Sequence, residues 1–173
     1  MDNHNVIIEQ ITNSIKVKQS LLENHQILES INFISNKITD CLKRGNKILI
    51  AGNGGSAADA QHIAGELVNR FNFDRPALAG IALTTDTSVL TAIGNDSAFK
   101  YIFSRQLEAI GVSGDVFWGI STSGNSENIL EACKTARGKN IFSFGLTGES
   151  GTKLSDICDI SICVPSSKTP RIQ

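Results

Sequence analysis

The chain has 173 residues, of which 40% are hydrophobic, and its formal net charge is −1 at pH 7. This length fits one compact domain with a proper core, and a near-neutral chain without a basic run argues against a nucleic-acid surface. No apolar stretch is long enough to span a membrane, and residues 1–5 lack the basic and apolar regions of a signal peptide. We therefore expect a cytoplasmic location and neither a membrane nor a nucleic-acid partner.

The N-terminal part, residues 5–44, is predicted to form two amphipathic helices. Their apolar faces consist of Ile7, Ile8, Ile11, Ile15 and Leu22 in the first helix and Ile27, Ile31, Ile34, Ile38 and Leu42 in the second. Asn24 is placed to cap the second helix, and Gly45 is placed to end it. Because residues 1–45 precede the first strand, they are not a crossover within a sheet. They can pack against another subunit or against the chain's own sheet, and we predict an oligomer.

Residues 47–71 are predicted to form a strand, a glycine-rich loop and a helix. The apolar run 48–51 has the length of a buried strand, and it is followed by Gly52, Asn53, Gly54 and Gly55. Ser56 is the predicted N-cap of a helix over 57–67. Exposed backbone N–H groups, a helix dipole and glycines that permit close approach favour an anion or a polar ligand at this loop.

His62 and Glu66 lie on one face of this helix because they are four residues apart. An imidazole nitrogen and a carboxylate oxygen at this spacing can bind one zinc ion. The same spacing also describes an ordinary hydrogen-bonded surface pair, which is the commoner case for an isolated H-x-x-x-E. The position, one turn beyond a predicted ligand loop, favours the zinc interpretation.

Downstream, short apolar strands alternate with helices. Strands are predicted at 80–83, 115–120, 141–145 and 160–164, and helices at 89–93, 98–110 and 129–137. The helix at 89–93 is predicted to end in a left-handed cap at 94–96, and the helix at 98–110 has Ile102, Leu107 and Ile110 as core candidates. Such alternation predicts a parallel sheet covered by helices on both faces, with ligands bound beyond the carboxyl ends of its strands.

The four cysteines show no C-x-x-C or zinc-knuckle spacing, and most fall in predicted core segments: Cys41, Cys133, Cys158 and Cys163. We interpret them as reduced cytosolic thiols rather than metal ligands.

A second strand–loop–helix unit is predicted at 115–137. Its loop is rich in hydroxyl groups, with Ser121, Thr122, Ser123 and Ser126 around Gly124. Hydroxyl groups and backbone amides at a helix N-terminus can bind a phosphate without any lysine, although an ordinary Ser/Thr-rich turn has the same composition. The chain has no G-x-x-x-x-G-K-[ST], and Ala57 replaces the third glycine of G-x-G-x-x-G, so neither an NTPase P-loop nor a dinucleotide fingerprint is present.

The motifs together resemble those of the phosphoheptose isomerases, a group of sugar-isomerase (SIS) domain enzymes. In chain order they are G-N-G-G-S (52–56), H-x-x-x-E (62–66), G-N-D (94–96), F-S-R (103–105), G-I-S-T-S-G-N-S (119–126) and R-I-Q (171–173). The S-T-S-G-N-S loop occurs in SIS domains generally, whereas its pairing with the first two motifs is more specific. The resemblance runs from about residue 45 to residue 173, and the N-terminal helices are compatible with it.

The resemblance implies a single SIS domain over 1–173. Its fold class would be α/β, a flavodoxin-like five-stranded parallel sheet at 46–173 with helices on both faces, preceded by the helical extension 1–45. It also implies a homotetramer with active sites between subunits. The implied reaction converts sedoheptulose 7-phosphate to D-glycero-D-manno-heptose 7-phosphate by proton transfer through an enediol, and the product would supply lipopolysaccharide or capsule.

The resemblance also implies roles for individual residues. The phosphate would be bound by Ser121, Thr122, Ser123 and Ser126, and the sugar by Asn53, Gly54, Gly55, Asn95, Asp96 and Gln173. Zinc would be bound by His62, Glu66 and Gln173, and Glu66 would also be the catalytic base. Aldose–ketose isomerisation needs such a base near the reacting carbons and a group that polarises the developing oxyanion.

The family continues beyond R-I-Q into a helix that carries a further histidine, a zinc ligand and acid/base partner. The histidines of this chain are His4, His25 and His62, so we expect that helix and its histidine to lie outside the 173 residues. Two other functions remain open: a non-catalytic SIS tetramer that binds a replication initiator, and a sugar-phosphate sensor. His62 with Glu66 favours the enzyme, because a binding module has no need of that pair.

Overall fold

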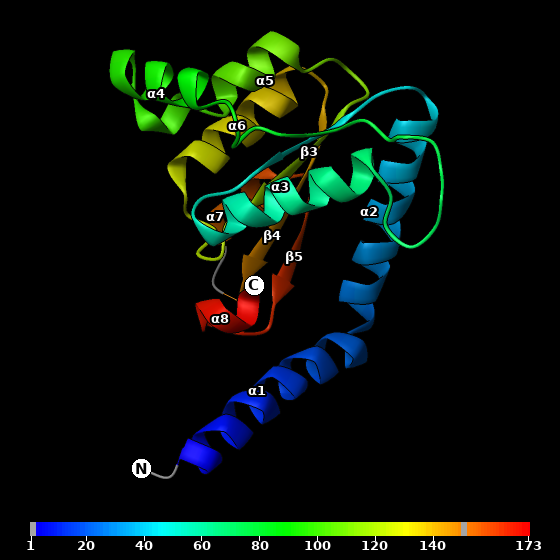
Figure 1. Ribbon diagram of the computed structural model, residues 1–173, viewed down its shortest axis with the longest axis vertical. Coiled ribbons are helices and arrows are strands. Elements are labelled where there is room, and N and C mark those ends of the chain that lie inside the picture. Colours follow the sequence, from blue (N-terminus) through cyan, green and yellow to red (C-terminus); the bar gives the residue numbers. More distant parts are fainter. Residues whose placement is uncertain (1–2, 150–151) are drawn as a thin grey trace.

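Five parallel strands form one central sheet in the computed structural model, which describes residues 3–149 and 152–173. The strands are β1 Ile48–Ala51, β2 Gly80–Ala82, β3 Val116–Ile120, β4 Phe142–Gly148 and β5 Ile160–Val164. Their order is β2-β1-β3-β4-β5, and all neighbouring pairs are parallel. This is the flavodoxin-like order, so the predicted fold class is confirmed (Figure 1).

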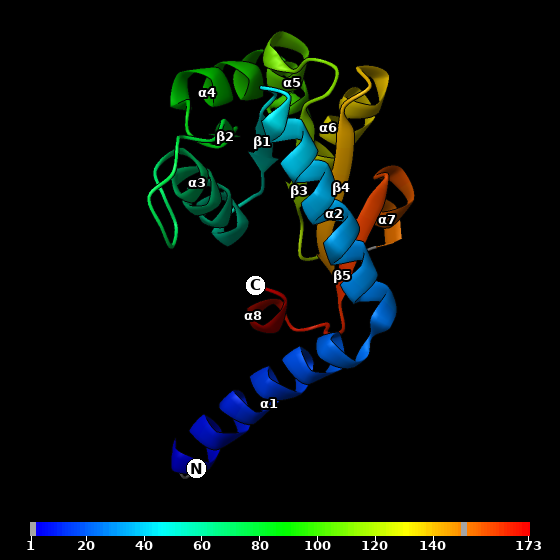
Figure 2. The same cartoon turned by 90° about the vertical axis from the view of Figure 1, so that its right-hand side faces the viewer.

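Helices cover both faces of the sheet (Figure 2). In chain order they are α1 Asn3–Glu23, α2 His25–Lys43, α3 Gly55–Val68, α4 Thr87–Asp96, the 3-10 helix η1 Phe99–Tyr101, α5 Ser104–Ile110, α6 Glu127–Gly138, α7 Thr152–Ile157 and α8 Thr169–Ile172. Side chains of α4, α5, α6 and α7 pack on one face, and those of α2 and α3 pack on the other. Within the described residues, no helix is both long and apolar enough to cross a membrane.

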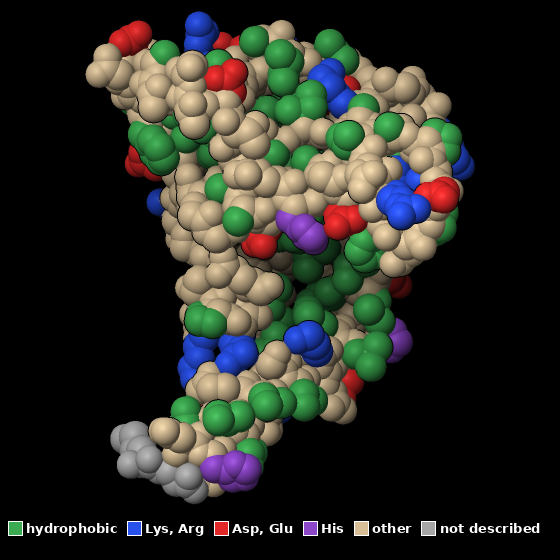
Figure 3. Space-filling model, in the orientation of Figure 1, with side chains coloured by type: hydrophobic (Ala, Val, Ile, Leu, Met, Phe, Trp, Pro, Cys, Tyr) green, Lys and Arg blue, Asp and Glu red, His purple; other side chains and the backbone are tan. Residues whose placement is uncertain are grey.

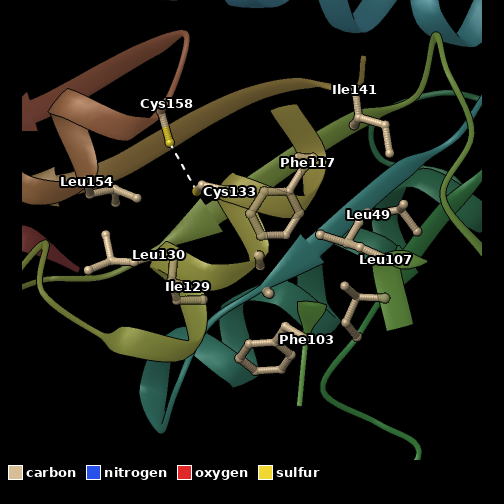
Figure 4. Close-up of a cluster of buried hydrophobic side chains, with 14 of the residues drawn as sticks. Leu49, Phe103, Leu107, Phe117, Ile129, Leu130, Cys133, Ile141, Leu154 and Cys158 are labelled. Carbon is tan, nitrogen blue, oxygen red and sulfur yellow. Dashed lines mark hydrogen bonds between the residues drawn. The ribbon is translucent and has the colours of Figure 1, made fainter. Parts of the chain in front are cut away.

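The face under α4 to α7 is closed by a well-packed core (Figure 4). Phe103, Phe117 and Leu107 are almost completely buried there. Cys133 and Cys158 belong to the same core, and their Sγ atoms lie 3.3 Å apart as free thiols. The contact with Cys158, together with burial, raises the pKa of the Cys133 thiol. The predicted core position of these cysteines is therefore correct.

The opposite face is only partly covered. α2 and α3 bury Ile34, Cys41 and Ala60 against the sheet, but the strip between the two helices leaves several large side chains half-buried. Trp118 is half-buried in this strip and packs on the fully buried Phe144, with the ring centroids 4.9 Å apart. Because the strip ends at the carboxyl edge of the sheet, it opens toward the loops where a ligand is expected.

The N-terminal helices form as predicted, but α1 does not pack on the sheet. Asn24 caps α2 by accepting a hydrogen bond from the N–H of Ile27, and Gly45 follows the helix with a positive φ of 79°. α1 has no buried residue among those described, and it projects away from the sheet (Figure 2). Its exposed apolar side chains are Val6, Ile7, Ile8, Ile11, Ile15 and Leu22. Packing of α1 on the chain's own sheet is excluded, and the oligomer remains a prediction.

Several local predictions are wrong. Ser56 is buried in the first turn of α3, and the N-cap is Gly54. α4 begins at Thr87, where Asp86 caps it, and runs to Asp96. Its C-cap is Ser97 with a φ of −126°, so the predicted left-handed cap at 94–96 is wrong. The helix expected at 98–110 is divided into η1 and α5, and Ile110 is 40% exposed at its end. α7 and α8 were not predicted because they are too short to show a helical period.

Asp115 ties together the beginnings of β1 and β3. Its side chain is completely buried, and its two oxygens accept hydrogen bonds from Lys47 N, Lys47 Nζ, Val112 N and Asn46 Nδ2. Burial alone would raise the pKa of this carboxyl, but the hydrogen bonds from Lys47, Val112 and Asn46 hold the pKa below its usual value. The two strands that end in the predicted ligand loops are thus held together at their opposite ends.

Candidate functional site

The two predicted ligand loops lie side by side. β1 and β3 are neighbours in the sheet, with Ala51 opposite Gly119, so the loops that follow them begin at the same edge. The chain passes from β1 outward to β2 and then returns to β3, which makes this the point where the winding of the sheet reverses. Open parallel sheets bind ligands at such a point.

The glycine loop, 52–55, is open and needs its glycines. A Cβ at Gly52 would lie 2.4 Å from the carbonyl oxygen of Ser56, so no other residue fits there without moving the backbone. Gly54 has a positive φ of 55° and is the N-cap of α3 without a side chain. No side chain caps the N-terminus of α3, although the N–H groups of Ser56 and Ala57 donate to the backbone carbonyls of Asn53 and Gly54. The uncapped helix N-terminus is compatible with a polar or anionic ligand.

The hydroxyl loop, 121–126, is held more firmly. Ser121 is buried, and its Oγ lies 2.9 Å from the Oγ of Ser126. The carbonyl of Thr122 accepts a hydrogen bond from Gly148 N, and the carbonyl of Gly124 accepts one from Leu154 N. The loop is therefore fixed by the end of β4 and by α7.

Ser126 stands at the N-cap of α6 but does not cap it. Its side chain makes no hydrogen bond to the backbone of the helix and lies against Ser121 instead. An ordinary Ser/Thr-rich turn would use this hydroxyl as a cap. The N-terminus of α6 is therefore left without a side-chain cap, which is compatible with the predicted phosphate site. Elsewhere in the loop, Ser123 Oγ accepts a hydrogen bond from Asn125 N, as in an ordinary Ser/Thr turn.

An amide pair joins the two loops. Asn53 Nδ2 donates to Asn128 Oδ1 over 2.9 Å, and Asn128 Nδ2 donates to Asn53 Oδ1 over 2.8 Å. Asn128 lies in the first turn of α6 and is 2% exposed. Sequence reasoning missed Asn128, because an asparagine just before the helix predicted at 129–137 gives no signal before the fold brings it to Asn53.

His62 and Glu66 lie on the outer side of α3, at the rim of the half-covered strip. Their side chains are 73% and 35% exposed, and His62 Nε2 lies 3.9 Å from Glu66 Oε1. Arg75 holds the end of this helix by donating to the carbonyl oxygens of Glu66 and Leu67. Arg75 is a second residue that the sequence did not mark.

Gln173 approaches the same helix from the far end of the chain. A Cβ at Gly55 would lie 2.5 Å from Nε2 of Gln173, so glycine at this position leaves space for the amide. His62 and Gln173 line one cavity of about 380 Å³ together with Asp59, Thr122 and Thr147. Figure 3 shows a hollow with hydrophobic side chains in its depth and a histidine beside acidic side chains at its rim.

Two of the three predicted zinc ligands, His62 and Gln173, line this cavity, whereas Glu66 lies one turn further along α3. Within residues 3–149 and 152–173, no cluster of three or more His, Cys, Asp or Glu side chains is present. His62, Glu66 and Gln173 offer one imidazole nitrogen, one carboxylate oxygen and one amide oxygen. Zinc accepts such N and O ligands, and three protein ligands leave a position for a substrate oxygen. Nickel or cobalt would accept the same donors.

Asn95 and Asp96 are not brought to this cavity. They lie exposed at the end of α4, where Asn95 Nδ2 donates to Asp96 Oδ1 over 2.7 Å. Neither lines the cavity that contains His62 and Gln173. The predicted residues of the two loops lie at the carboxyl edge of the sheet: Asn53, Gly54, Gly55, Ser121, Thr122, Ser123 and Ser126. Gln173 lies beside Gly55 and lines the cavity with His62. Glu66 is near the end of α3, where Leu67 packs against Gly80 at the start of β2.

Comparison with known proteins gives one consistent result. A family model described as "SIS domain" matches residues 12–148. A "Phosphoheptose isomerase" of Aneurinibacillus thermoaerophilus is 56% identical over 167 residues, which are 96% of this chain and 84% of that protein. A "Phosphoheptose isomerase 2" of Campylobacter jejuni subsp. jejuni is 55% identical over 100% of this chain and 87% of its own length.

Solved structures agree with the sequence comparison. A phosphoheptose isomerase structure from Neisseria gonorrhoeae matches with a TM-score of 0.90 at 42% sequence identity. The match covers 98% of this chain and 89% of that one.

Proposed function

The chain belongs to the SIS domain family, and we propose that it is the isomerase that converts sedoheptulose 7-phosphate to D-glycero-D-manno-heptose 7-phosphate. The reaction is an aldose–ketose isomerisation, and its product is a heptose precursor for lipopolysaccharide or capsule. The observation that supports this most is the edge shared by the hydroxyl loop and the glycine loop, beside a helix that bears His62 and Glu66.

The hydroxyl loop binds the phosphate of the substrate. Ser121, Thr122, Ser123 and Ser126 supply hydroxyl groups, and the first turn of α6 supplies N–H groups and the positive end of its dipole. The phosphate is remote from the carbons that react. Its binding therefore fixes the sugar in register without taking part in the chemistry.

Glu66 moves the proton between the two reacting carbons. A carboxylate is a suitable base for this step, and its contact with His62 and the fixing of the helix end by Arg75 hold it in place. Asn53, Gly54 and Gly55 bind the sugar hydroxyls. His62, Glu66 and Gln173 would hold a zinc ion, which when bound polarises the substrate oxygen on which charge develops.

The active enzyme is a homotetramer in the cytoplasm, with active sites between subunits. Three features support this proposal: the exposed apolar face of α1, the exposure of His62, and the distance of Asn95 and Asp96 from the cavity of their own chain. A neighbouring subunit would cover the first two, and it could bring Asn95 and Asp96 to another chain's site.

The test uses protein expressed to the natural stop codon of its gene. It is incubated with sedoheptulose 7-phosphate in heavy water, with zinc or with a chelator, and deuterium uptake and aldose formation are followed by mass spectrometry and NMR. Zinc-dependent exchange with aldose formation is the expected result. Tight binding of the sugar phosphate without exchange would overturn the isomerase and favour a sensor or a partner-binding tetramer.

A further inference from the structure

The Asn53–Asn128 pair is a closed unit within the structure. Each amide donates one hydrogen bond to the other and accepts one, over 2.9 Å and 2.8 Å. Asn128 is almost completely buried, whereas Asn53 is half-buried on the open glycine loop. The two residues are 75 positions apart, so the pair exists only because β1 and β3 are neighbours.

The pair also faces a concavity. Asn53 and Asn128 line a hollow of about 280 Å³ together with Ser126 and Lys100. An amide nitrogen has two N–H groups, and the pair uses one from each residue. Asn53 can donate its second N–H to a substrate oxygen. The two hydrogen bonds to Asn128 fix the plane of the Asn53 amide and therefore the direction of this N–H.

We propose that Asn128 is a positioning residue that acts through Asn53. It sets the orientation of the Asn53 amide toward the sugar and keeps the glycine loop at a fixed distance from the phosphate-binding loop. The two loops are then already in position for the two ends of the substrate. Such preorganisation reduces the entropy that is lost when the substrate binds. This inference rests on the proposed function, because it takes Asn53 as a sugar ligand.

A purely structural role would have a different signature. If Asn128 served only to satisfy a buried polar group, its loss would lower stability and leave catalysis by the folded protein unchanged. If it positions Asn53, its loss lowers kcat/KM, and the loss depends on the presence of Asn53. A double-mutant cycle separates the two cases.

The first experiment compares Asn128→Ala, Asn53→Ala and the double variant with the unchanged tetramer. We expect each single variant to lower kcat/KM about thirtyfold, and the double variant to be little worse than Asn53→Ala. Binding of sedoheptulose 7-phosphate, measured calorimetrically, should weaken in the same non-additive way. Multiplicative losses in the double variant, or an unchanged kcat/KM in Asn128→Ala, would overturn the proposal.

Ser143→Ala is the matched control. Ser143 is fully buried near the start of β4 and donates to Asp159 Oδ2 over 3.0 Å, far along the strand from both loops. Its loss removes a buried hydrogen bond, as the loss of Asn128 does. We expect a lower Tm and an unchanged kcat/KM. A similar fall in kcat/KM in this variant would show that general destabilisation explains the effect at Asn128.

The second experiment uses Asn128→Asp. A protonated carboxyl group can donate to Asn53 and accept from it, whereas the ionised form can only accept. Burial favours the neutral form, so the carboxyl should protonate above its usual pH range. We expect the ratio of kcat/KM in this variant to that of the natural protein to rise as pH falls. A ratio independent of pH would contradict the role of the reciprocal pair.

Failure of this inference can be distinguished from failure of the proposed function. If the natural protein neither exchanges deuterium nor forms aldose, the proposed function fails, whatever the variants do. If the natural protein is active and Asn128→Ala retains its kcat/KM, only the positioning role fails.

Discussion

The two strand–loop–helix units share a design but differ in how their own chain supports them. α6 buries six residues against the sheet, and its loop receives hydrogen bonds from Gly148 and Leu154. α3 buries three, its loop is exposed at Gly54 and Gly55, and His62 projects into solvent. The proposed phosphate-binding unit is thus well supported by its own chain, and the proposed catalytic unit is open on its outer side.

The difference follows from what each unit must do. A phosphate cradle works by fixed donors, and burial of α6 provides that rigidity. A base must reach the reacting carbons, so the role proposed for Glu66 requires an accessible surface. The four predictions below test this division, in order of expected size.

The largest effect is expected for Glu66→Gln. The amide keeps the shape of the side chain but cannot accept a proton, so kcat should fall about a thousandfold. Within the described part of the chain, the carboxylate approaches His62 at 3.9 Å and makes no shorter polar contact, so Tm should change little. Steady-state kinetics and thermal unfolding test both statements. A near-native rate would remove Glu66 from the catalytic role.

The next effect concerns the glycine loop. Gly52→Ala places a Cβ against the backbone of Ser56, and we expect a loss of about 3 kcal/mol in the free energy of unfolding. Gly54→Ala is the control, because its Cβ meets nothing within 4 Å. Only its positive φ is unfavourable, which costs about 1 kcal/mol. Equal losses in urea unfolding would show that the close approach at Gly52 is not decisive.

Asp115→Asn should lower the stability of both strand–loop–helix units equally, since Asp115 joins the beginnings of β1 and β3. We expect the free energy of unfolding to fall by about 2 kcal/mol at neutral pH, because the hydrogen bonds from Lys47 lose a charged acceptor. The folded pKa is below the unfolded value, so this contribution is present above about pH 4 and is lost as pH falls through the folded pKa.

The difference in stability between the natural protein and Asp115→Asn should therefore shrink on acidification. Urea unfolding at neutral pH and at about pH 3 measures it. A difference that grows as pH falls would contradict the direction assigned to the pKa of Asp115.

The smallest effect is expected for Ser126→Ala. It removes one of several donors to the phosphate, so KM should rise about fivefold with little change in kcat. The helix should lose no capping energy, because the hydroxyl makes no capping bond. A clear fall in Tm without a rise in KM would indicate that Ser126 has a structural role only.

The motifs that the sequence shows are local, and the structure confirms their local consequences. The run 48–51 is the buried strand β1, Asn24 caps α2, and the loop at 121–126 leads into α6. The failures lie at helix ends, as at Ser56 and Gly94. A helix begins or ends through a balance of small energies, and packing shifts that balance.

The sequence by itself determined the α/β class, both strand–loop–helix units and the placement of His62 and Glu66 on one face of α3, because each depends on residues close together in the chain. Only the tertiary structure decided that the loops are neighbours, that Asn128 meets Asn53, and that Gln173 reaches the side of Gly55. It also decided that Asn95 and Asp96 stay away from their own chain's cavity. These facts depend on strand order and on long-range packing, which no short stretch of sequence contains.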